Sequence, residues 1–183
     1  MGKKILIITG SPRIEGNSNT LVTAFAGGAF SRGHEVEIFD AGHANVNGCH
    51  ADKSCEKRGK CGQQDDGIKM NELMQWADVL VLASPVYWKG FTSQIKAVID
   101  RFYQFSFPKG RATVGVKEAY LIATAGNPDP AIFDSMVGEY SLVCDLLGFA
   151  DKGKLLCGGL GDLGAVKDHE DYLEAAVKMG MNV

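Results

Sequence analysis

The sequence predicts an α/β protein in which helices cover both faces of a doubly wound parallel sheet. Short apolar runs alternate with segments of helical spacing, and one of these runs, residues 79–84, is apolar almost without interruption. Such a run is typical of a strand that is buried on both faces. Because parallel strands need crossover helices, the alternation predicts a three-layer arrangement. With 183 residues, 45% of them hydrophobic, we expect one domain over residues 1–183.

The N-terminal half is expected to alternate strand and helix around one long loop. A β-branched apolar run that stops at Gly10 predicts the first strand, and apolar residues at helical spacing that end before Gly33 predict the first helix. The polar, cysteine-bearing stretch over residues 40–67 is long for a loop, which suggests a function. The elements expected here are a strand at 4–9, a helix near 21–30, a strand at 35–39 and a helix at 68–76.

The C-terminal half repeats this alternation. The apolar run that precedes Pro85 predicts the third strand, and an amphipathic pattern with Ile95, Val98 and Ile99 on one side predicts the helix that follows it. The elements expected here are a strand at 79–84, a helix at 93–103, a strand at 118–124, a helix at 130–147, a strand at 154–157 and a helix at 168–179.

Composition and charge limit the classes of partner. The chain has 19 basic and 22 acidic residues, a net charge of -3 and no block of like charge, so we expect no nucleic-acid or membrane partner. Small molecules or proteins are the expected partners. Five cysteines without an apolar export signal argue for reduced thiols or a metal site, and we expect a cytoplasmic protein.

The loop after the first strand carries the strongest signal for a binding site. Free amides at a helix N-terminus, joined by hydroxyl and amide side chains, suit a phosphate group. The alternative is an ordinary turn that Asn17 or Ser18 caps. Five residues separate Gly10 from Gly16 and no lysine follows, so the loop does not match that of nucleoside triphosphatases. The polar residues concerned are Ser11, Arg13, Asn17, Ser18, Asn19 and Thr20.

Two later loops are expected beside the first, because ligands of such sheets bind at the carboxyl ends of the strands. Residues 84–91 are rich in apolar and aromatic side chains, which suit a flat ring or, alternatively, a subunit contact. Residues 124–128 are small enough to let a ring edge approach the backbone. The G-x-G-x-x-G pattern at residues 159–164 follows the last strand, so we interpret it as a glycine-rich loop and not as a dinucleotide fingerprint.

Three stretches of the sequence together resemble a known family. They are Gly-Ser-Pro-Arg followed by Gly-Asn-Ser-Asn-Thr-Leu, then Ser-Pro-Val-Tyr-Trp-Lys-Gly, and then Ile-Lys-Ala-Val-Ile-Asp-Arg-Phe. These motifs resemble the flavodoxin-like NAD(P)H-dependent FMN reductases, including their iron-sulfur flavoprotein branch, and the resemblance extends over nearly the whole chain. It implies a flavodoxin-like fold with five strands in the order 2-1-3-4-5.

The resemblance also implies bound FMN, with NADH or NADPH as co-substrate. It places the FMN phosphate in the first loop, the isoalloxazine ring against the second, and Thr124 and Gly126 beside the ring or the ribityl chain. The flavin performs the hydride chemistry, so no catalytic side chain is expected. The expected cofactor-binding residues are Ser11, Arg13, Asn17, Ser18, Asn19, Thr20, Pro85, Val86, Tyr87, Trp88, Thr124 and Gly126.

The cysteines of the long loop depart from the iron-sulfur branch, which carries a compact set of four. Here Cys49, Cys55 and Cys61 are present, and Asp52 stands where another cysteine is expected. Cluster ligation normally takes four thiolates. Three thiolates with Asp52 or His50 still suit zinc or an atypical cluster. We interpret them instead as thiols of a structured loop, and expect no metal site.

The function expected from these patterns is an FMN-dependent oxidoreductase that moves electrons from NAD(P)H to a quinone, a nitro compound, a flavin or a similar acceptor. The alternatives are a flavodoxin-type electron carrier and an iron-sulfur flavoprotein without direct NAD(P)H chemistry. A carrier commonly steers its partners with a strong charge field, and a net charge of -3 is a weak one. The family suggests a homodimer or homotetramer; the acceptor and the preferred nicotinamide are left open.

Overall fold

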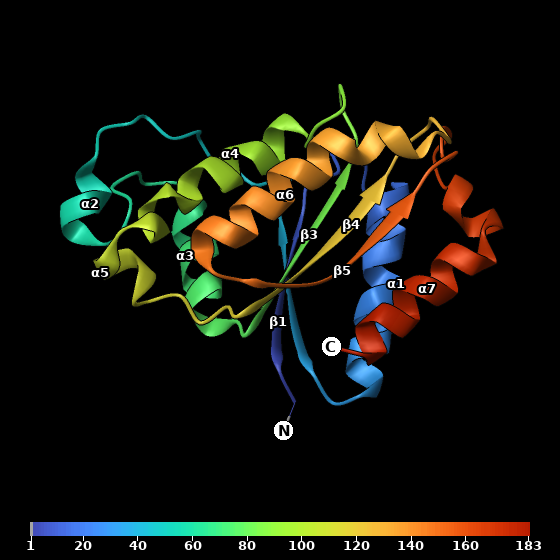
Figure 1. The fold of residues 1–183 in the computed structure, drawn as a ribbon, viewed down its shortest axis with the longest axis horizontal. Helices are drawn as coiled ribbons and strands as arrows, with labels where there is room; N and C mark the ends of the chain where they lie inside the picture. Colours follow the sequence, from blue (N-terminus) through green and yellow to red (C-terminus); the bar gives the residue numbers. More distant parts are fainter. Residues whose placement is uncertain (1) are drawn as a thin grey trace.

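Five parallel strands form the centre of the molecule, in the order β2-β1-β3-β4-β5 (Figure 1). The computed structural model describes residues 2–183. This order and the helices on both faces confirm the expected flavodoxin-like fold. The strands are β1 (Lys4–Thr9), β2 (Glu35–Asp40), β3 (Val79–Pro85), β4 (Glu118–Thr124) and β5 (Ala150–Cys157).

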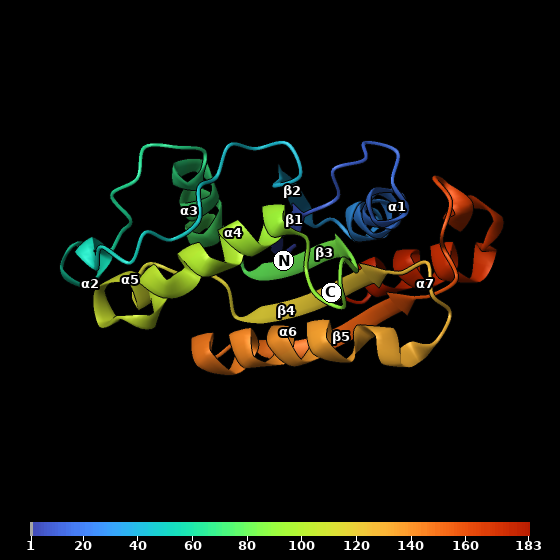
Figure 2. The ribbon, with the colours of Figure 1, turned by 90° about the horizontal axis from the view of Figure 1, so that it is seen from above.

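Helices cover the sheet in two layers, which Figure 2 shows from above. On one face, α1 and α7 pack together and against Ile5, Ile7 and Val81 of the sheet. On the other face, α3, α4 and α6 cover Leu6 and Leu82. The helices are α1 (Asn17–Ser31), α2 (Ser54–Arg58), α3 (Gly67–Trp76), α4 (Ser93–Arg101), α5 (Pro108–Arg111), α6 (Asp134–Leu147) and α7 (Glu170–Met181).

The structure differs from the sequence prediction mainly in short or polar segments. The expected helix at 93–103 ends at Arg101 and continues as a 3-10 helix over Phe102–Ser106, and the helix expected from Pro130 begins with a 3-10 turn over Pro130–Phe133. Strand β5 starts four residues early, at Ala150, because it lies at the sheet edge, where its first residues face solvent and carry no apolar pattern. Helices α2 and α5 are too short to show a period.

The start of α4 is fixed against the end of β1. The Thr92 hydroxyl donates a hydrogen bond of 2.7 Å to the carbonyl of Gly10, and it accepts one from the amide of Ile95 as the N-cap of the helix. A side chain at Gly10 would place its Cβ 2.6 Å from the Cβ of Ile95, so only glycine permits this contact. The loop after β1 therefore begins at a fixed place beside α4. Within residues 2–183, no helix is long and apolar enough to cross a membrane.

Candidate cofactor-binding site

A cleft of about 160 Å³ opens where the carboxyl ends of β1, β3, β4 and β5 meet. The loops after these four strands form its walls, as expected for a doubly wound sheet. Its lining combines hydroxyls, amides and apolar side chains. The lining residues are Ser11, Arg13, Gly16, Asn17, Ser18, Pro85, Val86, Tyr87, Thr124, Ala125, Gly126, Leu160, Gly161 and Leu163.

One wall of the cleft is the N-terminus of α1. Gly16 is the N-cap residue, with extended backbone, and no side chain caps the helix. The alternative of a turn capped by Asn17 or Ser18 is therefore wrong. The amides of the first turn and the positive end of a 15-residue helix face the region of the cleft. This is the arrangement that binds a phosphate group.

The polar side chains of the β1–α1 loop divide into two groups. Ser11, Arg13, Asn17 and Ser18 line the cleft. The Ser18 and Thr124 hydroxyls, both buried, lie 3.0 Å apart and form a hydrogen bond across the cleft wall. Either hydroxyl can be the donor, so Ser18 remains free to donate into the cleft when Thr124 donates to it.

Asn19 and Thr20 do not line the cleft. The Asn19 amide nitrogen donates to the carbonyls of Arg13 (3.0 Å) and Ile14 (3.2 Å), and its oxygen accepts from the Thr9 hydroxyl. The Thr20 hydroxyl donates to the carbonyl of Gly16, 3.3 Å away in its own helix. These two side chains therefore shape the loop, and their predicted contact with the phosphate has no support in this geometry.

The glycine-rich loop after β5 forms a wall that the sequence analysis did not predict. Asn17 holds it: its amide nitrogen donates to the carbonyls of Leu160 (3.2 Å) and Asp162 (2.9 Å), and its oxygen accepts from the amide of Val166 (3.1 Å). Leu160, Gly161 and Leu163 thereby join the cleft. The sequence indicates these residues only through their position after the carboxyl end of a strand, because their side chains do not point to a ligand.

The apolar wall comes from the ends of β3 and β4. Pro85, Val86 and Tyr87 line it, and the amide of Val86 donates to the carbonyl of Thr124 at 2.7 Å, which joins the two loops. Gly126 faces Gly161 closely: a Cβ at Gly126 would lie 3.3 Å from the Cα of Gly161. The small residues predicted in this loop thus let two backbones approach each other.

Trp88 lies outside this wall, in contrast to the prediction. Tyr87 and Gly90 exchange two backbone hydrogen bonds of 3.0 Å, with Trp88 and Lys89 at the tip of the turn. Both tip residues have left-handed backbone, with φ of 47° and 64°. The Trp88 side chain is completely exposed, and it does not line the cleft.

The residues of the cleft fit a molecule with an anionic end and a flat ring. The uncapped helix end, Arg13 and the Ser18 hydroxyl suit the anion, and the apolar wall suits the ring. Of the described residues, those that line the cleft include no carboxylate, histidine or cysteine. FMN has a phosphate at one end and a flat ring at the other. The chemistry of a reaction in this cleft depends on the molecule that binds there.

The three cysteines of the long loop line a second, smaller hollow of about 20 Å³, which has the size of one water molecule. Cys49 is exposed, Cys61 is half-buried, and burial raises the pKa of the buried Cys55 thiol, which keeps it protonated. No group of three potential ligands within residues 2–183 is placed to hold a metal ion. The loop as folded therefore does not fit an iron-sulfur cluster.

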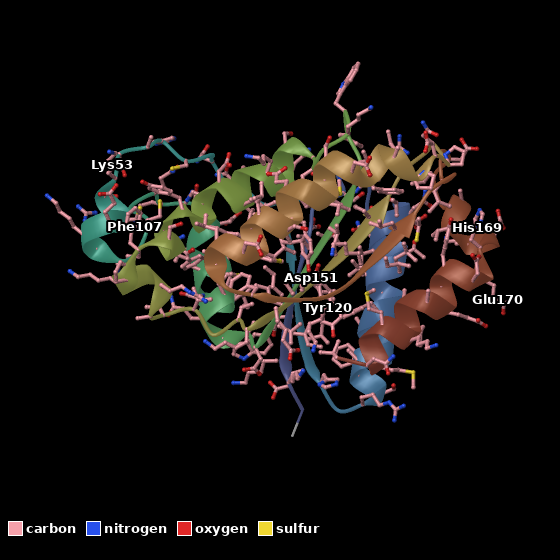
Figure 3. The ribbon with its side chains drawn as sticks, in the orientation of Figure 1. Lys53, Phe107, Tyr120, Asp151, His169 and Glu170 are labelled. Atoms are coloured by element: carbon pink, nitrogen blue, oxygen red, sulfur yellow. The ribbon has the colours of Figure 1, made fainter. Side chains whose placement is uncertain are left out.

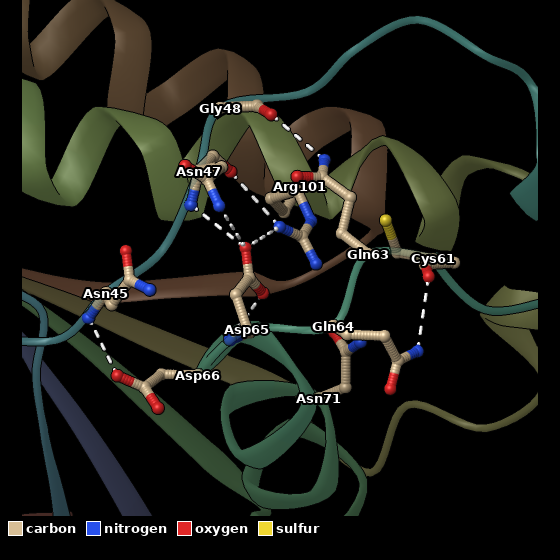
Figure 4. A network of polar contacts seen from close by, with 12 residues as sticks. Asn45, Asn47, Gly48, Cys61, Gln63, Gln64, Asp65, Asp66, Asn71 and Arg101 are labelled. Carbon is tan, nitrogen blue, oxygen red and sulfur yellow. Dashed lines mark hydrogen bonds and ion pairs between the residues drawn. The ribbon is translucent and has the colours of Figure 1, made fainter.

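Hydrogen bonds within the protein close the cysteine loop, as Figure 4 shows. The Asp65 carboxylate is buried with Arg101, and it accepts from Arg101 Nη1 at 2.9 Å, from the Asn47 amide at 3.0 Å and from the Gly67 amide at 3.0 Å. Burial raises the pKa of Asp65, but these bonds outweigh it and hold the pKa below its usual range. The loop is thus fixed to the end of α4.

The cleft and the cysteine hollow lie at opposite ends of α4, which starts beside Gly10 and ends at Arg101. Lys53 borders the hollow, and Figure 3 shows it at the opposite end of the molecule from His169, which precedes α7. The nine residues of α4 span about 13 Å at 1.5 Å per residue. The cysteines are therefore separate from the cleft within one chain.

Comparisons with known proteins agree with the fold. The chain is 36% identical over 98 residues to an iron-sulfur flavoprotein of Methanocaldococcus jannaschii, covering 54% of this chain and 51% of that protein. It spans about half the length of the iron-sulfur flavoproteins that it matches. It is 27% identical to Bacillus subtilis YwqN, named as an NAD(P)H-dependent FMN-containing oxidoreductase, over 96% of both chains.

Solved structures share the fold at low sequence identity. An NAD(P)H:quinone oxidoreductase of Methanothermobacter marburgensis superposes with a TM-score of 0.79 and 21% identity, covering 100% of this chain and 96% of that one. An FMN-dependent NADH-azoreductase of Bacillus anthracis, solved in complex with FMN, gives a TM-score of 0.71 and 13% identity, with 98% of each chain covered. The profile of the NADPH-dependent FMN reductases matches residues 3–132, which contain three of the four cleft loops. The chain belongs to this family of NADPH-dependent FMN reductases.

Proposed function

We propose that this protein binds FMN in the cleft and moves electrons from NADPH or NADH to a small organic acceptor, such as a quinone, a nitro compound or a flavin. FMN is the cofactor of the family to which the chain belongs. FMN bound there would supply the redox chemistry, which is the transfer of a hydride equivalent, two electrons, from a nicotinamide to an organic acceptor. The observation that carries the proposal is the uncapped N-terminus of α1 facing a cleft whose other wall is apolar.

The chain's own residues have the task of holding and orienting the two reactants. The amides at the start of α1 bind the phosphate, with Arg13 and Ser18 beside them. Asn17 keeps the loop after β5 in place, which keeps the cleft narrow. Positioning of this kind accelerates a two-substrate reaction because the reacting groups meet in a fixed geometry.

The apolar wall has a second task, which is to exclude water from the ring. Pro85, Val86 and Tyr87 offer a flat surface at the end of β3, and the hydrogen bond from Val86 to Thr124 keeps that surface rigid. No side chain with acid–base chemistry is needed for a hydride transfer. The absence of carboxylate, histidine and cysteine from the described lining is compatible with such a reaction.

The direct test mixes FMN-loaded protein with NADPH, and separately with NADH, in the absence of oxygen. We expect the yellow colour of the oxidised flavin to bleach rapidly with at least one of the two. Adding a quinone or a nitroaromatic compound afterwards should restore the colour and identify the acceptor class. If neither nicotinamide bleaches the flavin while dithionite does, the protein is not an NAD(P)H-dependent enzyme, and a flavodoxin-type carrier becomes the better description.

A second candidate is an iron-sulfur flavoprotein, because three cysteines line one hollow and several relatives carry that name. The number of thiols and the lack of a converging ligand set among the described residues count against it. Iron and acid-labile sulfide are measured on protein purified without oxygen. Less than one-tenth of an iron atom per chain is expected. Stoichiometric iron with sulfide would establish this second candidate instead.

The proposal includes a cytoplasmic homo-oligomer. The five free thiols fit a reducing compartment. The side chains of Leu142 and Leu146, one turn apart on α6, are about 70% exposed, which suits a contact between subunits. Light scattering of the purified protein determines the number of subunits.

A further inference from the structure

The turn over Tyr87–Gly90 carries an unusual pair of residues at its tip. Trp88 and Lys89 both have left-handed backbone, and the two hydrogen bonds between Tyr87 and Gly90 make the turn a closed, narrow loop. Turns of this geometry favour asparagine and glycine at the two tip positions, because other side chains are strained there. In Figure 1 this turn projects from the end of β3, beyond the neighbouring helices.

Packing within the chain gives no reason for a tryptophan and a lysine at these positions. The Trp88 side chain is completely exposed and rests on no neighbour. Among residues 2–183, the Lys89 ammonium group has no hydrogen-bond or ion-pair partner. A strained backbone at the edge of a binding cleft commonly serves function, since stability alone selects against it. The aromatic ring and the charge are therefore expected to meet a ligand.

The chemistry of this pair points to one half of a nicotinamide dinucleotide. Tyr87 lines the cleft and Trp88 follows it directly, so a molecule that extends out of the cleft across Tyr87 passes the tip of the turn. An exposed indole is a platform on which a purine stacks. A lysine ammonium beside that platform is placed for a phosphate on the attached ribose. NADPH carries a 2′-phosphate at that position, whereas NADH does not.

We infer that Trp88 stacks on the adenine of NADPH and that Lys89 binds its 2′-phosphate, which makes the turn the element that selects NADPH over NADH. This inference rests on the proposed function, in which the nicotinamide end of the same molecule enters the cleft. Trp88 and Lys89 act as positioning and specificity-determining residues, because they touch the remote end of the substrate and not the reacting atoms.

The first test measures binding without electron transfer. The chain has two tryptophans, so the variant Trp76→Phe leaves Trp88 as the single reporter. Trp76 packs under Lys4 and against the core near the start of β1, away from the cleft, so this change leaves the residues of the cleft untouched. NADP⁺ added to the FMN-loaded variant should quench the Trp88 fluorescence in a saturable way, and NAD⁺ should need about tenfold more ligand for the same effect.

The second test uses variants that relax the turn while removing its chemistry. In Trp88→Asn and Lys89→Asn, asparagine tolerates the left-handed backbone, so both variants should melt at a higher temperature than the wild type. Trp88→Asn should raise the KM for NADPH about tenfold and lower kcat much less. Lys89→Asn should reduce the preference for NADPH over NADH about tenfold. Lys178→Asn, at an exposed position of α7, is the matched charge control.

A rise in melting temperature together with a rise in KM is a result that a purely structural turn does not give. The inference is overturned if both variants keep the wild-type KM and preference, or if NADP⁺ leaves Trp88 fluorescence unchanged. It is also overturned if Trp88→Asn changes the number of subunits and not the KM, because Trp88 is then a contact between copies. If the wild type binds NADP⁺ at Trp88 but NADPH never bleaches the flavin, the proposed function fails and the binding inference stands.

Discussion

Replacing Ser18 by alanine is expected to weaken FMN binding by about 10- to 150-fold. A hydrogen bond to a charged group contributes about 1.5 to 3 kcal/mol, and each 1.4 kcal/mol changes the dissociation constant tenfold. The Ser18 hydroxyl lies in the cleft wall at the first turn of α1, with the Thr124 hydroxyl 3.0 Å away as its partner inside the protein. The alanine variant loses the donor to the phosphate.

Thr124 and Thr20 provide the comparison that makes this prediction specific. Thr124→Val removes the hydroxyl that orients Ser18, so a smaller loss of about 1 kcal/mol, roughly fivefold in affinity, is expected. The double variant should bind about as weakly as Ser18→Ala alone, because Thr124 acts through Ser18. Thr20→Val is the matched control: its hydroxyl bonds to the Gly16 carbonyl of the same helix, outside the cleft, so affinity should stay within about twofold.

The measurement is the quenching of FMN fluorescence when apoprotein is titrated into a dilute FMN solution. Circular dichroism and thermal melting of each apoprotein check that the variants are folded. Wild-type affinity in Ser18→Ala, or an equal loss in Thr20→Val, would refute the assignment of the phosphate to the start of α1. Additive losses in the double variant would show instead that Thr124 contacts FMN independently of Ser18.

Three further predictions concern stability. Arg101→Met leaves the buried Asp65 carboxylate without its cation, so the free energy of unfolding measured in urea should fall by about 3 to 5 kcal/mol. The double variant Asp65→Asn/Arg101→Met should recover part of this loss. A loss below about 1 kcal/mol in Arg101→Met would contradict the buried pair. Burial, with a smaller effect of Asp171, raises the pKa of Cys157 to about 12, whereas the pKa of a thiol in an unfolded chain is about 8.5. The folded state therefore loses stability as the pH rises from about 8.5 towards about 12. In Cys157→Ala the free energy of unfolding should depend less on pH in this range. An unchanged pH dependence would contradict the raised pKa of Cys157. Gly10→Ala forces a Cβ to within 2.6 Å of the Cβ of Ile95, so we expect the free energy of unfolding to fall by about 1 to 3 kcal/mol and FMN to be retained less well. If α4 shifts freely to make room for the Cβ, neither effect is observed.

The fold could be predicted because its determinants are local and repeated. Each buried strand is an apolar run, such as Ile5 to Ile8 and Val79 to Leu82, and each crossover helix shows its own spacing. The first part of β5 could not be predicted, because Asp151 and Lys152 lie at a sheet edge and their polar side chains face solvent. An edge strand forms by pairing with the backbone of its neighbour, so its own side chains need not show a strand pattern.

The candidate site could be predicted to the level of loops, and only partly to the level of residues. The loops after β1, β3 and β4 do converge on one cleft, which follows from the rule for parallel sheets. Which way a side chain points depends on backbone angles that the sequence does not state. The Trp88 side chain is exposed at the tip of its turn, where φ is 47°, and the Thr20 hydroxyl bonds to the Gly16 carbonyl of its own helix.

The start of α1 and the Asp65 carboxylate differ in what satisfies their polar groups. Around Asp65 the protein supplies the donors itself, from Arg101, Asn47 and Gly67, so the carboxylate needs no ligand. At the start of α1 no side chain caps the helix, so its amides depend on what enters the cleft. Both regions look alike in sequence, since both are long, polar and rich in asparagine and aspartate or serine. Only the assignment of donors to acceptors in three dimensions distinguishes them: the Asp65 carboxylate is bound within the protein, whereas no side chain caps the amides at the start of α1.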